Sequence, residues 1–473
     1  MVEPCETEPF DVVIVGSGPS GQKAAIQARK AGRKTAMIER EPGVGGACVH
    51  QGTIPSKTLR ETAVQMVRLR RGADVFNAQI GAGTEITRLL TRLDRVVTAH
   101  VKYMHNQLIR NGVHLLNGRA RFISPALLEV ESVTGKLRRL SAQIIVLATG
   151  SRPRNPSEIS VDHENILDSD SILSLSYLPE SLVVLGAGVI ASEYASVFAL
   201  LGVKVTVVDK TDRPLKFLDP ELTERFMREL QRNDGRFIGG CSASSVAFDG
   251  VSAVKTHLTN GETLTSEKVL VALGREANVD GLALAAAGLK ANTRGLIDVD
   301  QNCRTSVPHI YAVGDVIGPP SLASTSMEQG RRAVCHALGL SPGPGADLIP
   351  TGVYTVPEIS SVGLSAEEAQ RRGVKVVVGR ANFDQVARGQ ISGIDDGLLK
   401  LVADEHGKKL LGVQIVGDGA TDLVHVGMMA LLAGQDVDVF VENIFNFPTL
   451  AEAYRVAAFD VIEQRPASPS PAG

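Results

Sequence analysis

The chain has 473 residues, enough for about two to four domains, and contains 47 glycines but no tryptophan. Its formal net charge of −3 excludes a general affinity for nucleic acid or an anionic membrane, and no apolar run is long enough to span a bilayer. The five cysteines lack metal-ligand spacing and the acidic residues 1–10 lack the apolar stretch of a signal peptide, so we expect a reduced, cytoplasmic protein without a metal site.

The first motif is a glycine-rich turn between an apolar strand and a helix. Residues 10–15 predict a buried strand, the helix is expected to reach residue 31, and a second strand over 34–38 ends at Glu39. The turn contains Gly16, Gly18, Pro19 and Gly21. Its first glycine allows the tight turn, its second lets the helix N-terminus approach a pyrophosphate, and its third allows close helix–strand packing. We therefore predict a dinucleotide site, with Glu39 binding the adenosine ribose.

The same pattern recurs further along the chain. Residues 181–185 predict a strand, a helix is expected to reach residue 201, and the strand 204–208 ends at Asp209. The second turn contains Gly186, Gly188 and Ile190. A buried strand over 269–274, ending at Gly274, closes this unit. Because each such turn serves one nucleotide-binding unit, the two turns predict two dinucleotides held by two domains.

A further glycine-rich segment precedes a helix that we expect to begin near residue 55. It contains Gly45, Gly46, Cys48, Thr53 and Lys57. The segment resembles the redox segment of the class-I pyridine nucleotide-disulfide oxidoreductase family, which includes glutathione reductase and dihydrolipoamide dehydrogenase. Disulfide-reducing members have Cys-x-x-x-x-Cys here, whereas this chain has threonine at the second cysteine position. A single thiol cannot form the disulfide that passes electrons onward, so the expected protein lacks that relay.

The resemblance implies FAD in the first dinucleotide site and NAD or NADP in the second. It places flavin-nucleotide contacts at Arg40, Ala120, Gly150, Gly314 and Asp315, the last of which holds a ribityl hydroxyl. Without the resemblance, the segments around Ala120 and Gly150 are ordinary strand ends. The resemblance also implies that Lys57 and Glu193 form an ion pair beside the flavin, which contributes position and charge rather than stability. The alternative is that Lys57 is an ordinary surface lysine.

The C-terminal part of the chain has a different pattern of predicted strands and helices. Residues 353–361, 381–389, 398–403 and 411–416 predict strands, and helices are expected over 366–372, 421–432 and 449–463. This part resembles the family's dimerisation domain. Disulfide-reducing members have a histidine, oriented by a glutamate, that one subunit donates to the other's active site. Phe447 stands at that position, although Glu452 remains, and the alternative reading makes Phe447 a core residue. Without a second thiol and this proton donor, disulfide, lipoamide or mercuric ion reduction is not expected.

With those reactions not expected, hydride transfer at the flavin is the remaining candidate chemistry. Six segments together resemble the soluble pyridine nucleotide transhydrogenases within the family: residues 45–57, 168–173, 217–219, 311–324, 349–363 and 447–458. The implied reaction is NADPH + NAD⁺ ⇌ NADP⁺ + NADH through bound FAD. The two nicotinamides would use one site in turn, because the chain has one nucleotide unit besides that of the flavin.

The resulting fold prediction is an α/β protein with two Rossmann-like domains and a C-terminal α+β dimerisation domain. The FAD-binding domain is expected at 10–150 and 275–346, the NAD(P)-binding domain at 151–274, and the dimerisation domain at 347–464. The proline-, alanine- and serine-rich residues 465–473 predict a disordered tail. The expected assembly is a homodimer or a higher oligomer.

The sequence leaves several residue roles open. Cys48 is a residual core residue, a weak charge donor to the flavin, or a reactive thiol; we favour the first, because a lone thiol needs a special field to ionise. Thr53 either bonds to the flavin ring or caps the following helix. His50 lies near the flavin or belongs to an ordinary loop.

Nucleotide selectivity depends on the end of the second unit's second strand. Asp209 is expected to bind the 2′-hydroxyl of NAD and to repel the 2′-phosphate of NADP. Lys210 and Arg213 follow closely and supply charge for that phosphate. Our hypothesis is that Asp209 serves NAD(H) and that Lys210 or Arg213 serves NADP(H).

Two rival functions fit the same motifs. An NAD(P)H oxidase or diaphorase would pass the electrons to O₂ or a quinone, which an acceptor comparison with a nicotinamide nucleotide tests. A flavin-bearing binding protein, inactive after the loss of its disulfide, would keep an oxidised flavin under anaerobic NADPH.

Overall fold

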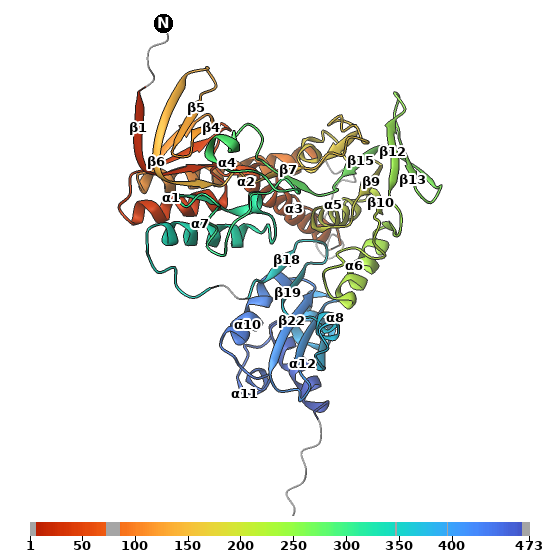
Figure 1. Ribbon diagram of the computed structural model, residues 1–473. Coiled ribbons are helices and arrows are strands. Elements are labelled where there is room, and N and C mark those ends of the chain that lie inside the picture. The colour runs from red at the N-terminus through yellow and green to blue at the C-terminus, as the bar shows by residue number, and fades with distance from the viewer. Residues whose placement is uncertain (1–5, 72–85, 346–347, 395, 466–473) are drawn as a thin grey trace, which may run out of the picture.

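The computed structural model describes residues 6–71, 86–345, 348–394 and 396–465. It has three units, each built on its own main sheet: the first unit at the upper left of Figure 1, the second at the upper right and the third below. The predicted tail residues 466–473 lie outside the described residues, whereas Arg465 is described and pairs with Asp438. Within the described ranges, no helix combines the length and apolarity that a bilayer crossing requires.

The first unit is a seven-stranded sheet in the order β3-β2-β1-β6-β5-β4, with β17 paired to β6. Its strands are β1 (Thr7–Val15), β2 (Thr35–Glu39), β3 (His114–Asn117), β4 (Arg119–Ser124), β5 (Leu127–Glu131), β6 (Leu137–Leu147) and β17 (Ile310–Ala312). Strand β1 runs parallel to β2 and β6, and residues 12–14 are fully buried, as expected for a parallel strand covered on both faces. Strand β6 pairs with β5 over its first half and continues along β1.

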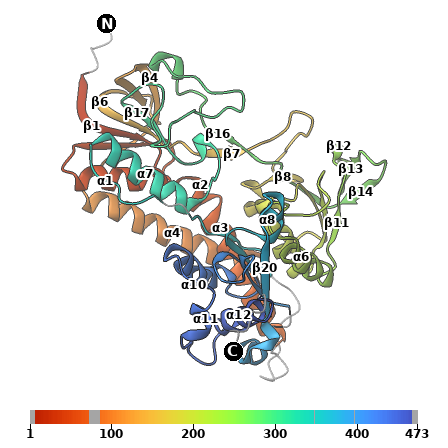
Figure 2. The same cartoon turned by 60° about the horizontal axis from the view of Figure 1, so that its bottom comes forward.

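Five helices accompany this sheet: α1 (Pro19–Lys30), α2 (Gly46–His50), α3 (Thr53–Arg71), α4 (Ile86–Arg110) and α7 (Ala323–Ala337). Helices α1, α4 and α7 lie on one side of the sheet in Figure 2, and α1 packs directly on α7. Helix α3 begins two residues earlier than the expected start near residue 55, directly after the turn that follows α2. It leaves the first unit and contacts α5 of the second, so α3 links these two units.

The second unit has a parallel sheet in the order β11-β10-β9-β15-β8 and a three-stranded antiparallel sheet, β12-β13-β14. The parallel strands are β8 (Ile166–Asp168), β9 (Ser181–Leu185), β10 (Lys204–Val208), β11 (Arg236–Ile238) and β15 (Lys268–Val271). The antiparallel strands are β12 (Ala243–Phe248), β13 (Val254–Leu258) and β14 (Thr263–Ser266), and the helices are α5 (Val189–Leu200) and α6 (Pro220–Arg232). The strand predicted to reach residue 274 stops at Val271, because the chain turns through Gly274, with φ of +110°, into the next strand.

A two-stranded antiparallel ribbon connects the first two units. Strand β7 (Ser151–Pro153) leads out of the first unit, and β16 (Arg275–Ala277) leads back to it. The ribbon therefore carries both crossings of the chain between the units.

The third unit is an antiparallel sheet in the order β18-β19-β22-β21-β20. Its strands are β18 (Thr351–Val353), β19 (Ile359–Gly363), β20 (Val376–Asn382), β21 (Leu398–Asp404) and β22 (Leu410–Val416). Its helices are α8 (Ala366–Arg371), α9 (Ala387–Ser392), α10 (Ala420–Leu432), α11 (Val439–Glu442) and α12 (Glu452–Glu463).

Two predicted strands of this unit are wrong. Residues 353–361 form the ends of two antiparallel strands with a loop between them, rather than one strand. The strand predicted over 381–389 ends at Asn382, because the side chains of Asn382 and Gln385 form a capping box that starts a short 3-10 helix followed by α9.

A buried ion pair holds the second unit against the third. Asp219 caps the N-terminus of α6 by accepting a hydrogen bond from the Glu221 backbone N–H. Both oxygens of the Asp219 carboxylate also accept bonds of 2.9 Å from Lys400 Nζ on β21. The two side chains are 1% and 2% exposed, so the Asp219 carboxylate depends on the Lys400 ammonium for its stabilisation. Lys400 Nζ also lies 2.6 Å from Glu221 Oε1.

Candidate functional site

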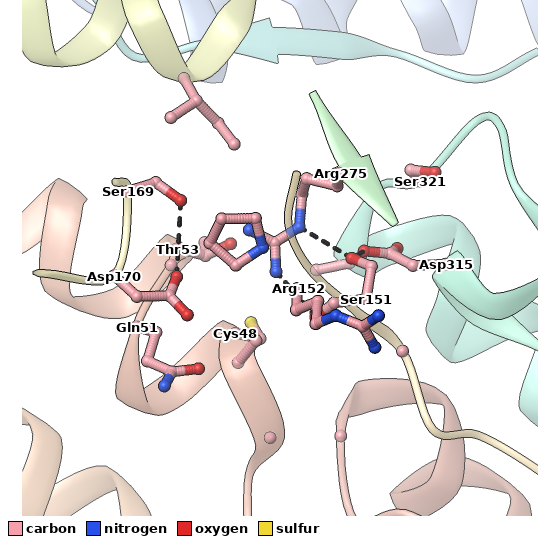
Figure 3. Close-up of a pocket in the computed structure, with 18 of the residues that line it drawn as sticks. Cys48, Gln51, Thr53, Ser151, Arg152, Ser169, Asp170, Arg275, Asp315 and Ser321 are labelled. Carbon is pink, nitrogen blue, oxygen red and sulfur yellow. Dashed lines mark hydrogen bonds between the residues drawn. The ribbon is translucent and has the colours of Figure 1, made fainter. Parts of the chain in front are cut away.

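A cavity of about 1790 Å³ lies where the three units meet. Both glycine-rich turns and the segment around Cys48 line it, together with Asp315 from the first unit and Tyr354 from the third. Figure 3 shows part of this cavity, with Cys48 and Thr53 opposite Arg275 and Asp315.

The first turn has the geometry that its glycines predict. Gly16 has a φ of +104°, and a Cβ there would lie 2.2 Å from the carbonyl oxygen of Ala148. A Cβ on Gly21 would lie 2.0 Å from the Gly16 carbonyl oxygen, so this glycine permits the helix–strand packing. By contrast, no protein atom lies within 4 Å of the Cβ position of Gly18, which lines the cavity beside Pro19 at the N-terminus of α1. The turn therefore leaves room for a ligand at its second glycine.

Glu39 is tied to this turn through Ser17. Its Oε2 accepts bonds from the Ser17 backbone N–H at 3.0 Å and from the Ser17 hydroxyl at 2.5 Å. Ser17 Oγ in turn accepts a bond of 2.9 Å from the N–H of Gly45, while Gly46 lines the cavity beside it. Ser17 was not among the predicted site residues, although a hydroxyl between two turn glycines was the available signal. Arg40, on the cavity wall, pairs with the exposed Glu41.

The second turn repeats the backbone of the first. Gly186 has a φ of +105°, and a Cβ there would lie 2.5 Å from the Ala272 carbonyl oxygen. Gly188 again has no protein atom within 4 Å of its Cβ position, and Ile190 and Gly274 line the cavity nearby.

The two basic side chains that follow Asp209 in the sequence take different positions relative to it in the structure. Asp209 accepts bonds from the Ala187 N–H at 2.8 Å and from the Thr211 N–H and hydroxyl at 2.7 and 2.6 Å. Lys210 is exposed and lines the cavity. Arg213 does not line the cavity; it donates to the Leu218 carbonyl oxygen and pairs with Glu367 of the third unit at 2.8 Å. The structure therefore brings Lys210, and not Arg213, to the cavity with Asp209.

Lys57 and Glu193 form an ion pair at the junction of the three units. Lys57 Nζ lies 2.6 Å from Glu193 Oε2, and the two side chains are 25% and 8% exposed. The other oxygen of Glu193 accepts a bond of 2.9 Å from the Tyr354 N–H of the third unit. The Tyr354 ring also lies beneath the Lys57 ammonium, which is 5.0 Å from its centroid. Lys57 is thus not a free surface lysine, and the missed residue Tyr354 holds the pair from the third unit.

The environment of Cys48 disfavours its thiolate. Burial raises the pKa of the Cys48 thiol, more than a hydrogen bond with Thr53 and the positive charge of Lys57 lower it. The negative charge of Asp315 also raises this pKa. A thiol that stays protonated is a poor nucleophile, which supports the least reactive of the three readings of Cys48.

The two remaining polar residues of this segment have simple positions. Thr53 is exposed and is the first residue of α3. His50 Nε2 lies 3.1 Å from the Val44 carbonyl oxygen, so its ring is bonded to the loop that precedes α2.

A chain of polar side chains that was not predicted from the sequence lines the cavity. Arg275 Nε donates to Ser151 Oγ at 2.8 Å, and Ser151 Oγ donates to Asp315 Oδ2 at 2.6 Å. Figure 3 shows Arg275 between these residues and Asp170, which belongs to the second unit. No local pattern connects these residues, because they lie on segments far apart in the sequence.

The cavity has the features that a dinucleotide cofactor requires. Ala120, Gly150, Gly314 and Asp315 line it, as the resemblance implies. The side-chain oxygens of Thr149 and Tyr194 are buried beside it without a hydrogen-bond partner in the described part of the chain, which leaves them available to a ligand. Together with the two turns that leave room at Gly18 and Gly188, these features fit bound nucleotides rather than a filled protein core.

The third unit presents apolar side chains to its surface. Phe447, at the position of the family's histidine, is 69% exposed, so the reading that makes it a core residue is wrong. Ile444 is 97% exposed and Met429 of α10 is 59% exposed. Exposed apolar side chains on one unit favour contact with another protein surface.

Comparisons with known proteins agree along nearly the whole chain. The family model described as pyridine nucleotide-disulphide oxidoreductase matches residues 10–330, and the model of that family's dimerisation domain matches residues 349–458. A protein named soluble pyridine nucleotide transhydrogenase from Mycobacterium tuberculosis is 43% identical over 458 residues, covering 96% of this chain and 97% of the relative. A protein of the same name from Pseudomonas aeruginosa is 40% identical over 457 residues, covering 95% and 98%.

Solved structures show the same fold. The crystal structure of LpdA from Mycobacterium tuberculosis has a TM-score of 0.87 and 27% identity, covering 96% of this chain and 99% of that chain. The HOCl-induced flavoprotein disulfide reductase RclA from Escherichia coli has a TM-score of 0.86 and 25% identity, covering 95% and 99%.

Proposed function

Because the chain belongs to the pyridine nucleotide-disulphide oxidoreductase family, whose models match residues 10–330 and 349–458, we propose that it is a flavin-dependent transhydrogenase. The reaction is NADPH + NAD⁺ ⇌ NADP⁺ + NADH. The relatives that are 43% and 40% identical, named soluble pyridine nucleotide transhydrogenase, support this proposal. The observation that carries it is one cavity that is lined by both glycine-rich turns and by one cysteine, Cys48, whose thiol pKa is raised by burial.

In this proposal, FAD is the resident cofactor of the first unit. The N-terminus of α1 at Gly18 receives the pyrophosphate, Glu39 receives the adenosine ribose, and Asp315 receives the ribityl chain. A bound flavin supplies the redox chemistry, because its ring accepts a hydride from a reduced nicotinamide and gives one to an oxidised nicotinamide.

The protein's own contribution is position and charge. The Lys57 ammonium, held by Glu193 and the Tyr354 ring, places a positive charge on the wall of the cavity. The ammonium is restricted in position because Glu193 of the second unit and the Tyr354 ring of the third unit both contact it. The Gly188 turn of the second unit admits NADP(H) and NAD(H) alternately.

The structure directs the selectivity hypothesis to one of the two cations. We assign the 2′-phosphate of NADP(H) to Lys210, which lines the cavity, and the 2′-hydroxyl of NAD(H) to Asp209. Lys210→Ala should raise the KM for NADPH about tenfold relative to the KM for NADH, as expected for one lost charged hydrogen bond. Arg213→Ala is the matched control, because its guanidinium already binds Leu218 and Glu367, and it should leave the ratio of the two KM values unchanged. A larger change in that ratio from Arg213→Ala contradicts the assignment.

The apolar surface of the third unit supports a homodimer. Phe447, Ile444 and Met429 are exposed in the single chain, and the dimerisation-domain model matches the unit that carries them. Sedimentation of the wild type and of Ile444→Asp tests this: the wild type should be dimeric or larger, and the variant should dissociate more readily.

The decisive experiment is anaerobic reduction by NADPH followed by addition of NAD⁺, observed at the flavin absorption band. The proposal expects bleaching with NADPH and recovery of the band with NAD⁺ in the absence of any dithiol. A band that bleaches with NADPH but recovers only with O₂ or a quinone favours the oxidase or diaphorase reading. A band that never bleaches contradicts both.

A further inference from the structure

The ribbon between the first two units brings side chains to the cavity as well as connecting the chain. Strands β7 and β16 pair with Ala277 opposite Ser151 and Arg275 opposite Pro153. The N–H of Asn278 extends this pairing with a bond of 2.9 Å to the Gly150 carbonyl oxygen. Because both crossings of the chain lie in this ribbon, the ribbon and the contact of α3 with α5 together position the second unit on the first.

Arg275 and Ser151 form a hydrogen-bond chain with a defined direction. Arg275 donates from Nε to Ser151 Oγ and from Nη2 to the Ser151 carbonyl oxygen, both at 2.8 Å. A guanidinium has no acceptor and a serine hydroxyl has one proton, so the hydroxyl proton is directed to Asp315 Oδ2, 2.6 Å away. Ser151 is 7% exposed, so water does not readily replace either partner.

The hydrogen-bond chain from Arg275 through Ser151 occupies one carboxylate oxygen of Asp315 and leaves the other available to another partner. In the described part of the chain, Asp315 Oδ2 accepts the Ser151 bond, and no donor is found for Oδ1. The carboxylate lines the cavity at the start of the short 3-10 helix Gly314–Ile317. A carboxylate fixed through one oxygen presents the other in one orientation. Less conformational entropy is then lost when a ligand hydroxyl binds to it.

The guanidinium of Arg275 also faces the second unit. Asp170 follows β8 and lies across the cavity from Ser151, with Arg275 between them (Figure 3). Burial raises the pKa of Asp170, and the positive charge of Arg275 opposes this rise. Arg275 therefore lies between a carboxyl group of the second unit and the Ser151–Asp315 pair of the first.

We propose that Arg275 is a positioning residue that acts through Ser151 to orient the Asp315 carboxylate, so that retention of FAD depends on how the second unit is seated. This inference rests on the proposed function, in which Asp315 binds the ribityl chain. Loss of Ser151 removes the bond that holds the carboxylate, and loss of Arg275 frees the Ser151 hydroxyl to turn away from the carboxylate. In both cases the cost appears in the affinity for FAD. The two residues act in series, so losing both costs no more than losing one.

The test measures free FAD after ultrafiltration of a dilution series of the purified holoprotein. Ser151→Ala and Arg275→Met should each raise the Kd for FAD about tenfold, the equivalent of one hydrogen bond to a charged group. The double variant should match the single variants, because the residues share one path to Asp315. Ser151→Thr keeps the hydroxyl and should stay near the wild-type value. Arg138→Met is the control, since Arg138 pairs with Glu8 on the first sheet, away from the cavity.

Three results overturn the inference while leaving the proposed function intact. These are unchanged FAD retention in Ser151→Ala, multiplied effects in the double variant, or loss in Ser151→Thr equal to that in Ser151→Ala. Thermal unfolding by circular dichroism identifies variants that lose flavin because they lose the fold, and Arg275→Lys then replaces Arg275→Met, with a smaller rise in Kd expected. Wild-type protein that binds no FAD contradicts the proposed function itself.

Discussion

The two glycine-rich turns share a backbone but hold their acidic residues differently. The first glycines, Gly16 and Gly186, have φ values of +104° and +105°, and each abuts a carbonyl oxygen of the neighbouring strand. The third glycine of the first turn is replaced by Ala191 in the second. The turn geometry is therefore the constant element of a dinucleotide site, and the surroundings carry the differences.

The surroundings of the two turns differ by the hydroxyl group of one side chain. In the first unit, Ser17 joins Glu39 and the N–H of Gly45, which ties the turn to the segment that leads to Cys48. In the second unit the corresponding position is Ala187, so Asp209 binds its N–H and otherwise depends on the local residue Thr211. Both networks stay within their own unit, but the first joins three segments, whereas the second joins the turn only to the strand end at Asp209 and Thr211. This difference fits a resident flavin in the first unit and exchanging nicotinamide nucleotides in the second.

The prediction with the largest expected effect compares glycine-to-alanine substitutions in the two turns. Gly16→Ala combines a φ of +104° with a Cβ only 2.2 Å from a carbonyl oxygen, so it should destabilise the first unit by about 3 kcal/mol or more and abolish FAD binding. Gly186→Ala, with a contact of 2.5 Å, should impair use of both nicotinamide nucleotides while the protein still retains FAD. Denaturant unfolding and the flavin content of the purified protein measure the two effects.

The matched control is Gly18→Ala, because no protein atom lies within 4 Å of the new Cβ. It should keep the stability of the wild type and weaken FAD binding alone. Equal destabilisation by Gly16→Ala and Gly18→Ala contradicts the distinction between packing and ligand-facing glycines.

A second prediction concerns the attachment of the second unit to the third. Lys400→Met leaves the Asp219 carboxylate, 1% exposed, without its cation, and should destabilise the protein by about 3–5 kcal/mol. Arg380→Met removes a partly exposed pair with Glu221 and should cost about 1 kcal/mol or less. Urea unfolding of both variants measures the difference, and Lys400→Met/Asp219→Asn should recover much of the loss. Similar losses in the two single variants show that the buried pair is not the main attachment.

The predictable parts of the fold were those encoded by local pattern. The strands expected over 181–185 and 204–208 appear with the same bounds, because short apolar runs that end at a glycine turn or an acidic residue have few alternatives in a parallel sheet. The strand predicted over 381–389 failed because a side-chain capping box, rather than hydrophobic pattern, sets where β20 ends.

The site was predictable only where residues of one segment act together. The Lys57–Glu193 pair came from resemblance, and the structure shows the contact. Ser151, Arg275 and Tyr354 were missed because their partners lie on distant segments, and no spacing in the sequence connects them. Arg213 was placed near Asp209 by proximity in sequence, whereas its guanidinium turns to Glu367 of the third unit.

The smallest expected effect is a pH dependence of stability that arises at the contact between the second and third units. Hydrogen bonds from Arg380 and from Lys400 lower the pKa of Glu221 from 4.5 to about 2. A carboxylate with a lowered folded-state pKa stabilises the fold above its unfolded pKa and loses that contribution as the pH falls toward its folded pKa. The attachment should therefore weaken between about pH 4.5 and pH 2, and Glu221→Gln should reduce the pH dependence of stability across that window. Urea unfolding at several pH values measures this, with Glu41→Gln, an exposed residue of the first unit, as the control. An equal reduction in the control would assign the acid sensitivity to general charge rather than to the contact between the second and third units.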